Sequence, residues 1–567
     1  MTIPSLTKNW WTYPVLPDDV NKRLLNYPRF LRQVLFNRGI IDPEQAGVYL
    51  KAQDPRHDPF QLIGMNETIQ RLFQAVDQHE GIAIYGDYDV DGVTATALMV
   101  QVLQRFGAHV DRYIPNRFDE GYGLNNSSLD EIKKVFNSQV ILTVDCGIRS
   151  PREAEYAREL GIDLIITDHH FPQDVLPNAF AIICPKQESD PYPFKELSGV
   201  GVAYKIAQAL FATRKVGDWI ADDWLDLVAL GTVSDLVPLV DENRALVRKG
   251  IQQIRYGHRL GVRALCGVAG KDPTRITAGD IGYALGPRLN AAGRMESALK
   301  AYDLLVSEKM EVAGLLAQEL DDQNTNRQRA TRNAQEKAED SIMAGEVSNL
   351  ISSFDEDYSS GIVGLVASKL VEHYYRPAIV GSIEGELIRA SCRSINEFHI
   401  TRALDECADL LLRHGGHSMA AGFTVHKDFK DQLLDKLMVI ADRELDGIDL
   451  RPTLKIDIEL LLEEVTPRIY PELEKLQPTG MGNPAVLLAL KNVDLADMQQ
   501  IGKEKTHLRF KIPGSQVEQA IAFNQSQWYE IWLSQRPKFD LAFTIEINSF
   551  NGKDTQQLHV KDMKPSG

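Results

Sequence analysis

The sequence has few cysteines, and they form no CxxC pair. Its 567 residues include five cysteines, an odd number scattered along the chain. A disulfide framework is therefore a poorer interpretation than free thiols in a reducing cytoplasm. Phosphate-binding glycine patterns are also missing. No Gly-x-x-x-x-Gly-Lys occurs, and Gly199-Val200-Gly201 lacks the third glycine of a dinucleotide fingerprint. No nucleotide cofactor site is expected.

Long apolar runs are absent, and so is an excess of positive charge. No uninterrupted apolar stretch reaches the length of a membrane span. The first residues have neither the basic nor the apolar part of a secretory signal, so we expect a cytoplasmic protein with no membrane association. Lys and Arg number 62 against 79 Asp and Glu, a net charge of −17. This charge argues against a general nucleic-acid coat protein but leaves room for a local basic groove.

The most informative segment that is present is residues 86–92, where Asp87, Asp89 and Asp91 alternate and a glycine follows. A strand-like apolar run precedes them and a helical pattern follows. Three carboxylates this close repel one another, and a bound divalent cation is the simplest remedy. An EF-hand calcium loop is excluded, because its twelfth position would be Leu98 and a strand stands where a helix should. A solvated acidic turn remains the alternative when the segment is considered alone.

Two further apolar runs end in side chains of the same chemistry. Residues 139–144 lead into Asp145, and residues 163–167 lead into Asp168, His169 and His170. Parallel sheets place their sites at the carboxyl ends of strands, so these groups should converge. Aspartate and histidine together suit Mn²⁺ or Mg²⁺.

A fourth acidic candidate is Asp235, in a Gly-Thr-x-Ser-Asp segment that could also serve only as a cap. Two metal ions need about four to six protein ligands with one shared carboxylate. The predicted ligand set meets that need, with Asp145 as the natural bridge: Asp87, Asp89, Asp91, Asp145, His169 and Asp235.

The pattern of apolar runs predicts an α/β protein of several domains. We expect a parallel-sheet domain, joined by a long exposed helix to a second α/β domain, and then a C-terminal β-barrel of about five strands, an OB-fold. Asn551-Gly552 is a hairpin-turn signal in that barrel. The expected boundaries are 1–60 for a helical lead-in, 61–308, 309–346 for the helix, 347–448 and 449–567.

The order of these motifs resembles the DHH phosphoesterase superfamily, and its RecJ branch in particular. The acidic segments and Asp168-His169-His170 are similar to the four N-terminal motifs of the superfamily. Residues 286–294 and 361–368 resemble segments of the RecJ branch, and residues 415–422 resemble the GGH signature of a DHHA1 domain. The resemblance covers nearly the whole chain.

Several residues are candidates for binding a phosphodiester. Arg288, Asn290 and Arg294 lie in a Gly/Pro-bounded segment that we interpret as a turn, where they grip phosphate or merely pair locally. The resemblance implies a pocket for a 5′-terminal phosphate, made of Arg117, Ser391, Arg393 and Ser394.

Two glycines followed by His417 form either a tight turn or, beside an expected helix start, a phosphate contact. Near the C-terminus, Lys503, Lys505 and Arg509 are either a solvated strand edge or a face that tracks a nucleic acid.

The resemblance implies a two-metal 5′→3′ exonuclease that hydrolyses single-stranded DNA to mononucleotides in DNA repair and recombination. Asp168 or His170 would orient the attacking water, and His417 would contact the scissile phosphate. It further implies a monomer, with a single-strand-binding protein and a helicase as partners. The alternatives are nano-RNases, cyclic-dinucleotide phosphodiesterases, pyrophosphatases and a non-catalytic replication scaffold. Nano-RNases would have a shorter chain, and cyclic-dinucleotide phosphodiesterases would carry membrane helices. Pyrophosphatases would act on a smaller substrate, and a scaffold would have lost metal ligands.

Overall fold

The computed structural model describes residues 8–55, 57–116, 120, 123–343, 347–550 and 553–566. These residues form two compact units. One unit combines the N-terminal 53 positions with residues 451–567, and the other spans residues 54–450. Within these ranges, no helix has both the length and the apolar character needed to span a bilayer.

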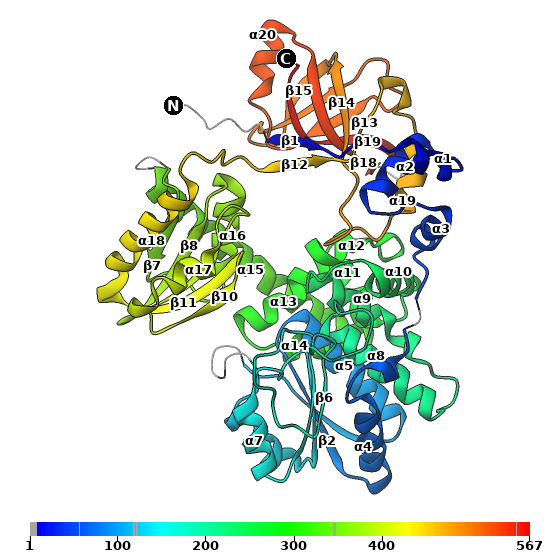
Figure 1. Ribbon diagram of the computed structural model, residues 1–567, viewed down its shortest axis with the longest axis vertical. Coiled ribbons are helices and arrows are strands. Elements are labelled where there is room, and N and C mark those ends of the chain that lie inside the picture. Colours follow the sequence, from blue (N-terminus) through cyan, green and yellow to red (C-terminus); the bar gives the residue numbers. More distant parts are fainter. Residues whose placement is uncertain are drawn as a thin grey trace. The chain divides into compact units, whose positions relative to one another are not determined.

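The predicted parallel sheet is confirmed in the first part of the 54–450 unit (Figure 1). All neighbouring strands pair in parallel, in the order β3-β2-β4-β5-β6. Their bounds are β2 (Gly81–Gly86), β3 (His109–Tyr113), β4 (Val140–Val144), β5 (Asp163–Thr167) and β6 (Ala181–Ile183). Because successive side chains of a strand alternate, Ile82 and Ile84 enter one core and Ala83 and Tyr85 the other. The sheet is therefore buried on both faces.

Helices cover both faces of this sheet. One face is packed by α4 (Met65–Gln78), α5 (Val90–Arg105) and α8 (Gly199–Thr213), and the other by α6 (Asn126–Glu131) and α7 (Pro151–Glu159). A helical layer follows in the chain, with α9 (Leu225–Ser234), α10 (Asp241–Tyr256), α11 (Leu260–Val268), α13 (Gly286–Met295) and α14 (Leu299–Val306). Apolar side chains of this layer join the first core, so the layer and the sheet form one body.

The expected long helix is α15 (Met310–Met343), a proline-free segment of 34 residues. It is less exposed than predicted, because both of its ends have an apolar face. Ala317 and Leu320 belong to the first core, whereas Ala334 and Ala338 pack in the core of the following α/β region. The helix therefore connects two cores through side-chain packing as well as through the backbone.

The second α/β region has a five-stranded sheet in the order β10-β11-β9-β8-β7. Only β7 and β8 pair in parallel. The strands are β7 (Ile351–Asp355), β8 (Ala378–Glu384), β9 (Leu387–Arg393), β10 (Arg413–His417) and β11 (Ala420–His426), and the helices are α16 (Val363–Tyr374), α17 (Ile400–Asp405) and α18 (Lys430–Leu445). The expectation of a helix start after the double glycine was wrong. Alternating Ala421, Phe423 and Val425 are buried, which makes this segment a strand.

The C-terminal sheet has seven strands, two more than expected, in the order β13-β14-β18-β19-β17-β16-β15. They are β13 (Ile458–Glu459), β14 (Leu488–Val493), β15 (Ala496–Ile501), β16 (His507–Lys511), β17 (Gln519–Ala522), β18 (Phe539–Phe550) and β19 (Lys553–Pro565). In β16, Leu508 and Phe510 are buried and Arg509 between them is exposed, so this strand has one face in the core. In β18, every residue from Phe539 to Ile545 is buried, so both faces of that strand are covered. The predicted turn at residues 551–552 lies outside the described residues. Helices α19 (Ile469–Glu474) and α20 (Trp528–Gln535) complete this part of the chain.

The N-terminal segment folds with this C-terminal sheet. Strand β1 (Asn9–Thr12) pairs in parallel with β12 (Thr453–Ile456). The helices α1 (Asp18–Arg23), α2 (Arg29–Asn37) and α3 (Pro43–Lys51) pack here, and this segment contributes Leu24, Leu31 and Leu35 to the same core as the sheet. The Trp10 indole also donates a 2.6 Å hydrogen bond to Asp562. One core thus requires both ends of the chain.

Candidate metal centre

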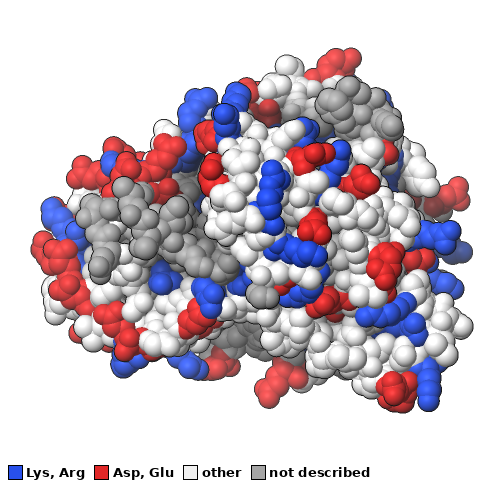
Figure 2. Space-filling view, turned by 90° about the horizontal axis from the view of Figure 1, so that it is seen from above, with Lys and Arg blue, Asp and Glu red and all other residues white. Residues whose placement is uncertain are grey.

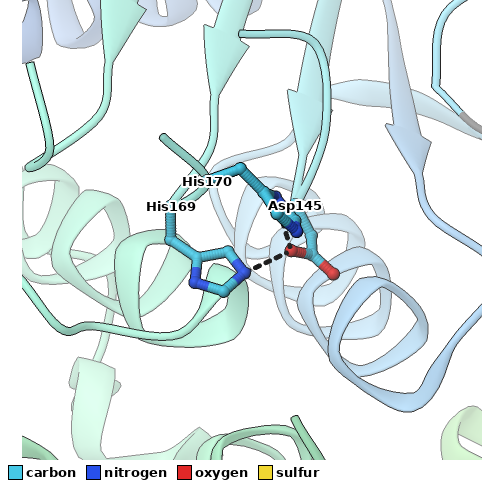
Figure 3. A group of neighbouring side chains, drawn as sticks. All are labelled: Asp145, His169 and His170. Carbon is cyan, nitrogen blue, oxygen red and sulfur yellow. Dashed lines mark ion pairs between the residues drawn. The ribbon is translucent and has the colours of Figure 1, made fainter. Parts of the chain in front are cut away.

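Acidic and imidazole side chains converge at the carboxyl edge of the parallel sheet. Ligand atoms lie within 4.8 Å of one another in three groups: Asp145, His169 and His170; Asp91, His169 and Asp235; and Asp87, Asp89 and Asp145. Figure 3 shows His169 and His170 both pointing at Asp145, with ring nitrogens 3.0 and 4.0 Å from its Oδ1. Nε2 of His169 is also 3.5 Å from Asp235 and 4.0 Å from Asp91. Asp145 and His169 each belong to two groups, as a shared ligand would.

The first acidic motif is shaped by the start of α5. Asp89 is the N-cap of this helix, and its Oδ1 accepts hydrogen bonds from the amides of Asp91 and Gly92. A side chain on Gly92 would meet the backbone of Asp87 at 2.5 Å. The strand-to-helix turn therefore packs the three carboxylates together and requires glycine where the helix begins.

A second helix start holds the most buried carboxylate of the cluster. The two oxygens of Asp91 accept hydrogen bonds from the amides of Gly199 and Val200, at 2.6 and 2.8 Å, in the first turn of α8. Unpaired amides and the helix dipole make this end of a helix a good site for negative charge. The arrangement fixes the carboxylate before any cation binds.

Glycine is required where α8 approaches the centre. A Cβ atom on Gly199 would lie 2.5–2.6 Å from the side chain of Asp145, closer than real contacts allow. Asp145 itself has a left-handed backbone, with φ of 64°. Such a conformation is unfavourable for a residue other than glycine and is found at functional sites. Both features bring a buried carboxylate against a helix start.

The electrostatics of the cluster call for a cation. Burial, reinforced by the charges of Asp91 and Asp89, holds the pKa of Asp145 well above its ordinary value. Burial and the same two neighbours raise the pKa of Asp235 to about 9, while burial and the charge of Asp89 raise that of Asp91 to about 7. Burial lowers the pKa of His169 to about 3, which favours the neutral ring that ligates metals. Without a cation, these groups cannot all be ionised near neutral pH.

His170 and Asp168 form a separate pair beside the carboxylates. Nδ1 of His170 lies 2.7 Å from Oδ1 of Asp168, which also accepts the backbone amides of both histidines. Burial alone would lower the pKa of His170, but the hydrogen bond and charge of Asp168 raise it. Burial likewise opposes ionisation of Asp168, but the hydrogen bond from His170 lowers the pKa of Asp168 to about 2. Asp168 therefore orients the ring of His170.

The residues present fit a hard or borderline divalent ion. Oδ1 of Asp145 and Nε2 of His169 are buried without a hydrogen-bond partner among the described residues, as expected for atoms that ligate a metal. Carboxylate oxygens with one imidazole suit Mn²⁺ or Mg²⁺. The three groups with two shared members match the donor set of a two-ion site.

The candidates at residues 288–294 lie in a helix, which corrects the expected turn. They belong to α13, where proline occupies a position in the first turn. Arg288 donates to Asp321 and to the carbonyl of Ala284, so the local pairing that was the alternative is present. Asn290 accepts the amide of Val90 at 3.2 Å, which ties α13 to the first acidic motif.

The second α/β region brings two arginines to one short segment. Arg294 donates to the carbonyl of Gly361 at 3.4 Å, and a Cβ on Gly364 would lie 3.0 Å from the guanidinium of Arg393. Ser391 lies on the same strand as Arg393, and its hydroxyl would lie 3.4 Å from that Cβ. The Ser394 hydroxyl instead donates to the carbonyl of Phe398 and is buried.

The remaining candidates lie elsewhere. His417 ends strand β10, exposed, and its carbonyl accepts a hydrogen bond from Thr401. Lys503, Lys505 and Arg509 belong to the other unit, on the turn between β15 and β16 and on β16 itself. In the view of Figure 2, Lys and Arg occur in small groups separated by Asp and Glu. Arg117 lies outside the described residues.

Sequence reasoning missed two contributors. Gly199-Val200-Gly201 was considered only as a dinucleotide motif, although Ser198 in front of it is a helix-capping signal that predicts amides aimed at an anion. The second contributor is Lys186. Its positive charge acts on both His169 and Asp235, and no local pattern marks it.

Comparisons with known proteins agree with this arrangement. The N-terminal domain of the DHH family matches residues 81–232, the DHHA1 domain matches residues 346–442, and the RecJ OB domain matches residues 456–562. The match thus includes the barrel as well as both α/β regions.

Curated relatives and solved structures match nearly the whole chain. Single-stranded-DNA-specific exonuclease RecJ of Bacillus subtilis is 40% identical over 544 residues, 95% of this chain and 68% of that protein. The Escherichia coli protein of the same name is 33% identical, over 95% and 96%. The crystal structure of RecJ in complex with Mn²⁺ from Thermus thermophilus has a TM-score of 0.84 at 28% identity, over 99% of this chain and 80% of that one. The corresponding Mg²⁺ complex has a TM-score of 0.78 at 26% identity, over 99% and 79%.

Proposed function

The chain belongs to the RecJ family of DHH phosphoesterases, and from this premise we propose that it is a metal-dependent exonuclease that hydrolyses single-stranded DNA from 5′ to 3′ into 5′-mononucleotides. The observation that carries the proposal is the cluster at the carboxyl edge of the sheet, where Asp145 and His169 each join two groups of ligands. Family membership places DNA among the phosphodiesters that such a centre acts on, and the matching barrel domain favours a long strand over a small substrate.

We propose that the ligands of two Mn²⁺ or Mg²⁺ ions are Asp87, Asp89, Asp91, Asp145, His169 and Asp235, with Asp145 shared. Bound ions would activate water and stabilise negative charge on the phosphoryl oxygens. Two of the proposed ligands are positioned by the fold itself. The α8 amides hold the carboxylate of Asp91, and Asp145 has a left-handed backbone that directs its carboxylate toward the cluster. Preorganisation of this kind reduces the rearrangement needed when the substrate arrives.

We propose that His170 orients the attacking water. Its pairing with Asp168 fixes the ring, and its raised pKa keeps the imidazolium populated at a higher pH than for an ordinary histidine. A charged donor forms a stronger hydrogen bond to the oxygen of that water than a neutral one. Asp168 is then a positioning residue that acts through His170.

Substrate phosphates are proposed to contact the second α/β region. Arg294 and Arg393 meet at residues 361–364, so two guanidinium groups face one short segment. This supports a pocket for the 5′-terminal phosphate, completed by Ser391 and by Arg117. Arg288, Asn290 and His417 are proposed contacts along the DNA strand. Ser394, whose hydroxyl donates to the carbonyl of Phe398, is proposed to support the pocket. Lys503, Lys505 and Arg509 are proposed to follow the strand on the barrel.

One experiment tests the proposed reaction. The purified chain is incubated with Mn²⁺ and a single strand labelled at either its 5′ or its 3′ end. We expect labelled mononucleotides to appear at once from the 5′ label, and a shrinking ladder from the 3′ label. A duplex with blunt ends should resist hydrolysis. Release of mononucleotides first from the 3′ label would contradict the proposed polarity, and cuts within a circular strand would contradict exonuclease action.

The cellular setting is also a proposal. We infer a cytoplasmic monomer that acts in DNA repair and recombination, alongside a single-strand-binding protein and a helicase. Membership of the family supports this setting. Light scattering should give the mass of one 63.6 kDa chain. Co-purification of a single-strand-binding protein from the same cells, in the absence of DNA, would test the first partner.

A further inference from the structure

Two large, exposed apolar residues directly follow residues of the metal centre in the sequence. Phe171 follows the Asp168-His169-His170 motif and is 60% exposed, and Leu236 follows Asp235 and is 65% exposed. Nε2 of His169 lies 3.5 Å from Oδ2 of Asp235, so both side chains start from backbone that adjoins the same cluster. Single exposed apolar residues are ordinary, but two at one polar centre need an explanation.

The ring of Phe171 is held in place. Arg149 donates a 2.8 Å hydrogen bond from Nε to the carbonyl of Phe171. The ammonium of Lys186, whose side chain is only 11% exposed, lies 4.8 Å from the ring centroid. This cation covers one side of the ring from within the protein, while more than half of the residue remains open to solvent. The result is an aromatic surface that is open to solvent on the side away from Lys186.

The backbone of Leu236 is strained where the side chain is presented. Its φ is 61°, in the left-handed region that disfavours residues with a Cβ. A branched apolar residue in this conformation gains nothing from burial that would offset the strain, because the side chain is exposed. The left-handed residue directly follows the C-cap of α9, so the end of this helix presents the exposed side chain next to Asp235.

We propose that Phe171 and Leu236 form an apolar rim that contacts the unpaired nucleobase next to the scissile phosphate, with Phe171 as the stacking surface. This inference rests on the proposed function. An aromatic face accepts every base, so the rim positions the nucleotide without reading its sequence. In a duplex both faces of the base are stacked and its edge is paired. The rim would therefore favour single strands at the reacting nucleotide itself.

The test compares two 5′-phosphorylated strands in Mn²⁺: an intact one, and one whose first two nucleotides are abasic. For the wild type, we expect kcat/KM to be about tenfold lower on the abasic strand, the order of magnitude of one base–aromatic stack. Phe171→Ala should lose about tenfold on the intact strand, chiefly through KM, and should no longer distinguish the two strands. Phe171→Trp should restore the distinction. Leu236→Ala should reduce it in part.

The same loop supplies a matched control. Phe180 is 48% exposed, but its amide bonds to the carbonyl of Leu164 near the start of β5, at the opposite edge of the sheet from His169. Phe180→Ala should behave as the wild type does. Phe171→Leu keeps apolar bulk without the ring and so controls for a folding defect. Its ratio of kcat/KM for the intact strand to kcat/KM for the abasic strand should resemble that of Phe171→Ala.

The possible failures are distinct. If the wild type hydrolyses the intact strand but Phe171→Ala keeps the full preference for it, the rim is wrong and the proposed function stands. If the wild type shows no preference between the strands, the rim is equally wrong. If the wild type hydrolyses neither strand with Mn²⁺ or Mg²⁺, the proposed function fails, and the rim fails with it.

Discussion

The metal centre and the unit of residues 1–53 and 451–567, here called the barrel unit, differ in how far apart in the sequence their contacting residues lie. Every proposed ligand lies at the end of a strand or helix, within a few residues of it, so each motif is short and contiguous. The barrel unit instead depends on residues more than 400 positions apart, such as Trp10 with Asp562 and Arg29 with Glu464. The comparison teaches that the residues of a reactive site can lie in short segments of the sequence, while the contacts that stabilise another part of the fold join its two ends.

The largest expected effect comes from Asp145, the proposed shared ligand. Asp145→Ala should reduce hydrolysis more than about a hundredfold, since loss of partners in the outer shell alone costs about 10–100-fold. Circular dichroism should show an intact fold. Asp77→Ala is the matched control, because that surface aspartate pairs with Arg214, away from the ligands. Near-normal hydrolysis by Asp145→Ala would refute the bridging role.

Gly199→Ala tests whether α8 belongs to the metal centre. The added methyl would meet the Asp145 side chain at about 2.5 Å. Displacing this carboxylate should weaken Mn²⁺ affinity, measured by titration calorimetry, and activity by about 10–100-fold. Gly267→Ala is the control, since its Cβ would meet nothing within 4 Å. Equal metal affinity in both variants would show that the helix start is not coupled to the ligands.

Arg393→Ala addresses the proposed end pocket. Losing one charge-assisted contact should reduce the preference for a 5′-phosphorylated over a 5′-hydroxyl end by about tenfold. The measurement is the ratio of kcat/KM for the two ends. Arg389→Ala, on the same strand but paired with Glu384, should leave that ratio unchanged. A ratio that survives in Arg393→Ala would place the phosphate elsewhere.

The barrel unit should show a smaller effect. Deleting residues 451–567 is not a clean test, because the N-terminal helices would lose the core they share. The triple substitution of Lys503, Lys505 and Arg509 by alanine removes charge and leaves packing intact. We expect about a threefold rise in KM for long strands and a shallower salt dependence, with dinucleotides unaffected. Lys538→Ala is the control for a single lost charge. An equal rise in KM for long strands and for dinucleotides would contradict the binding of the DNA strand by these three residues.

The smallest effect concerns stability without metal. A carboxyl whose folded pKa is raised stabilises the fold fully below its unfolded pKa of about 4, and this stabilisation is lost as pH rises through the folded value. For Asp235 that value is about 9. In metal-free protein, Asp235→Asn should therefore melt at the same temperature as the wild type near pH 4 and a few degrees higher near pH 9. Scanning calorimetry in the presence of a chelator measures the two melting temperatures. A difference between the variant and the wild type that is the same at pH 4 and pH 9 would contradict the raised pKa of Asp235.

Local patterns were enough to predict much of the molecule. Strands were expected over residues 81–85, 139–144 and 163–167 from their apolar, β-branched character, and they form over 81–86, 140–144 and 163–167. The same pattern predicted convergence of Asp145 with Asp168 and His169, because parallel strands end at one edge. Errors occurred where periodicity was short. Residues 286–295 form a helix whose proline stands in the first turn, where it is tolerated, and residues 420–426 form a strand despite their glycine.

The sequence by itself indicated the candidate ligands, the strands of the parallel sheet that precede them and the family, because each of these is written in contiguous residues. Tertiary structure alone decided that α8 amides hold Asp91, that Lys186 lies beneath Phe171, and that the first 53 residues share the core of the barrel. These contacts join segments that lie between 15 and several hundred residues apart in the sequence. They arise from burial and packing, which select partners by shape and not by distance along the chain.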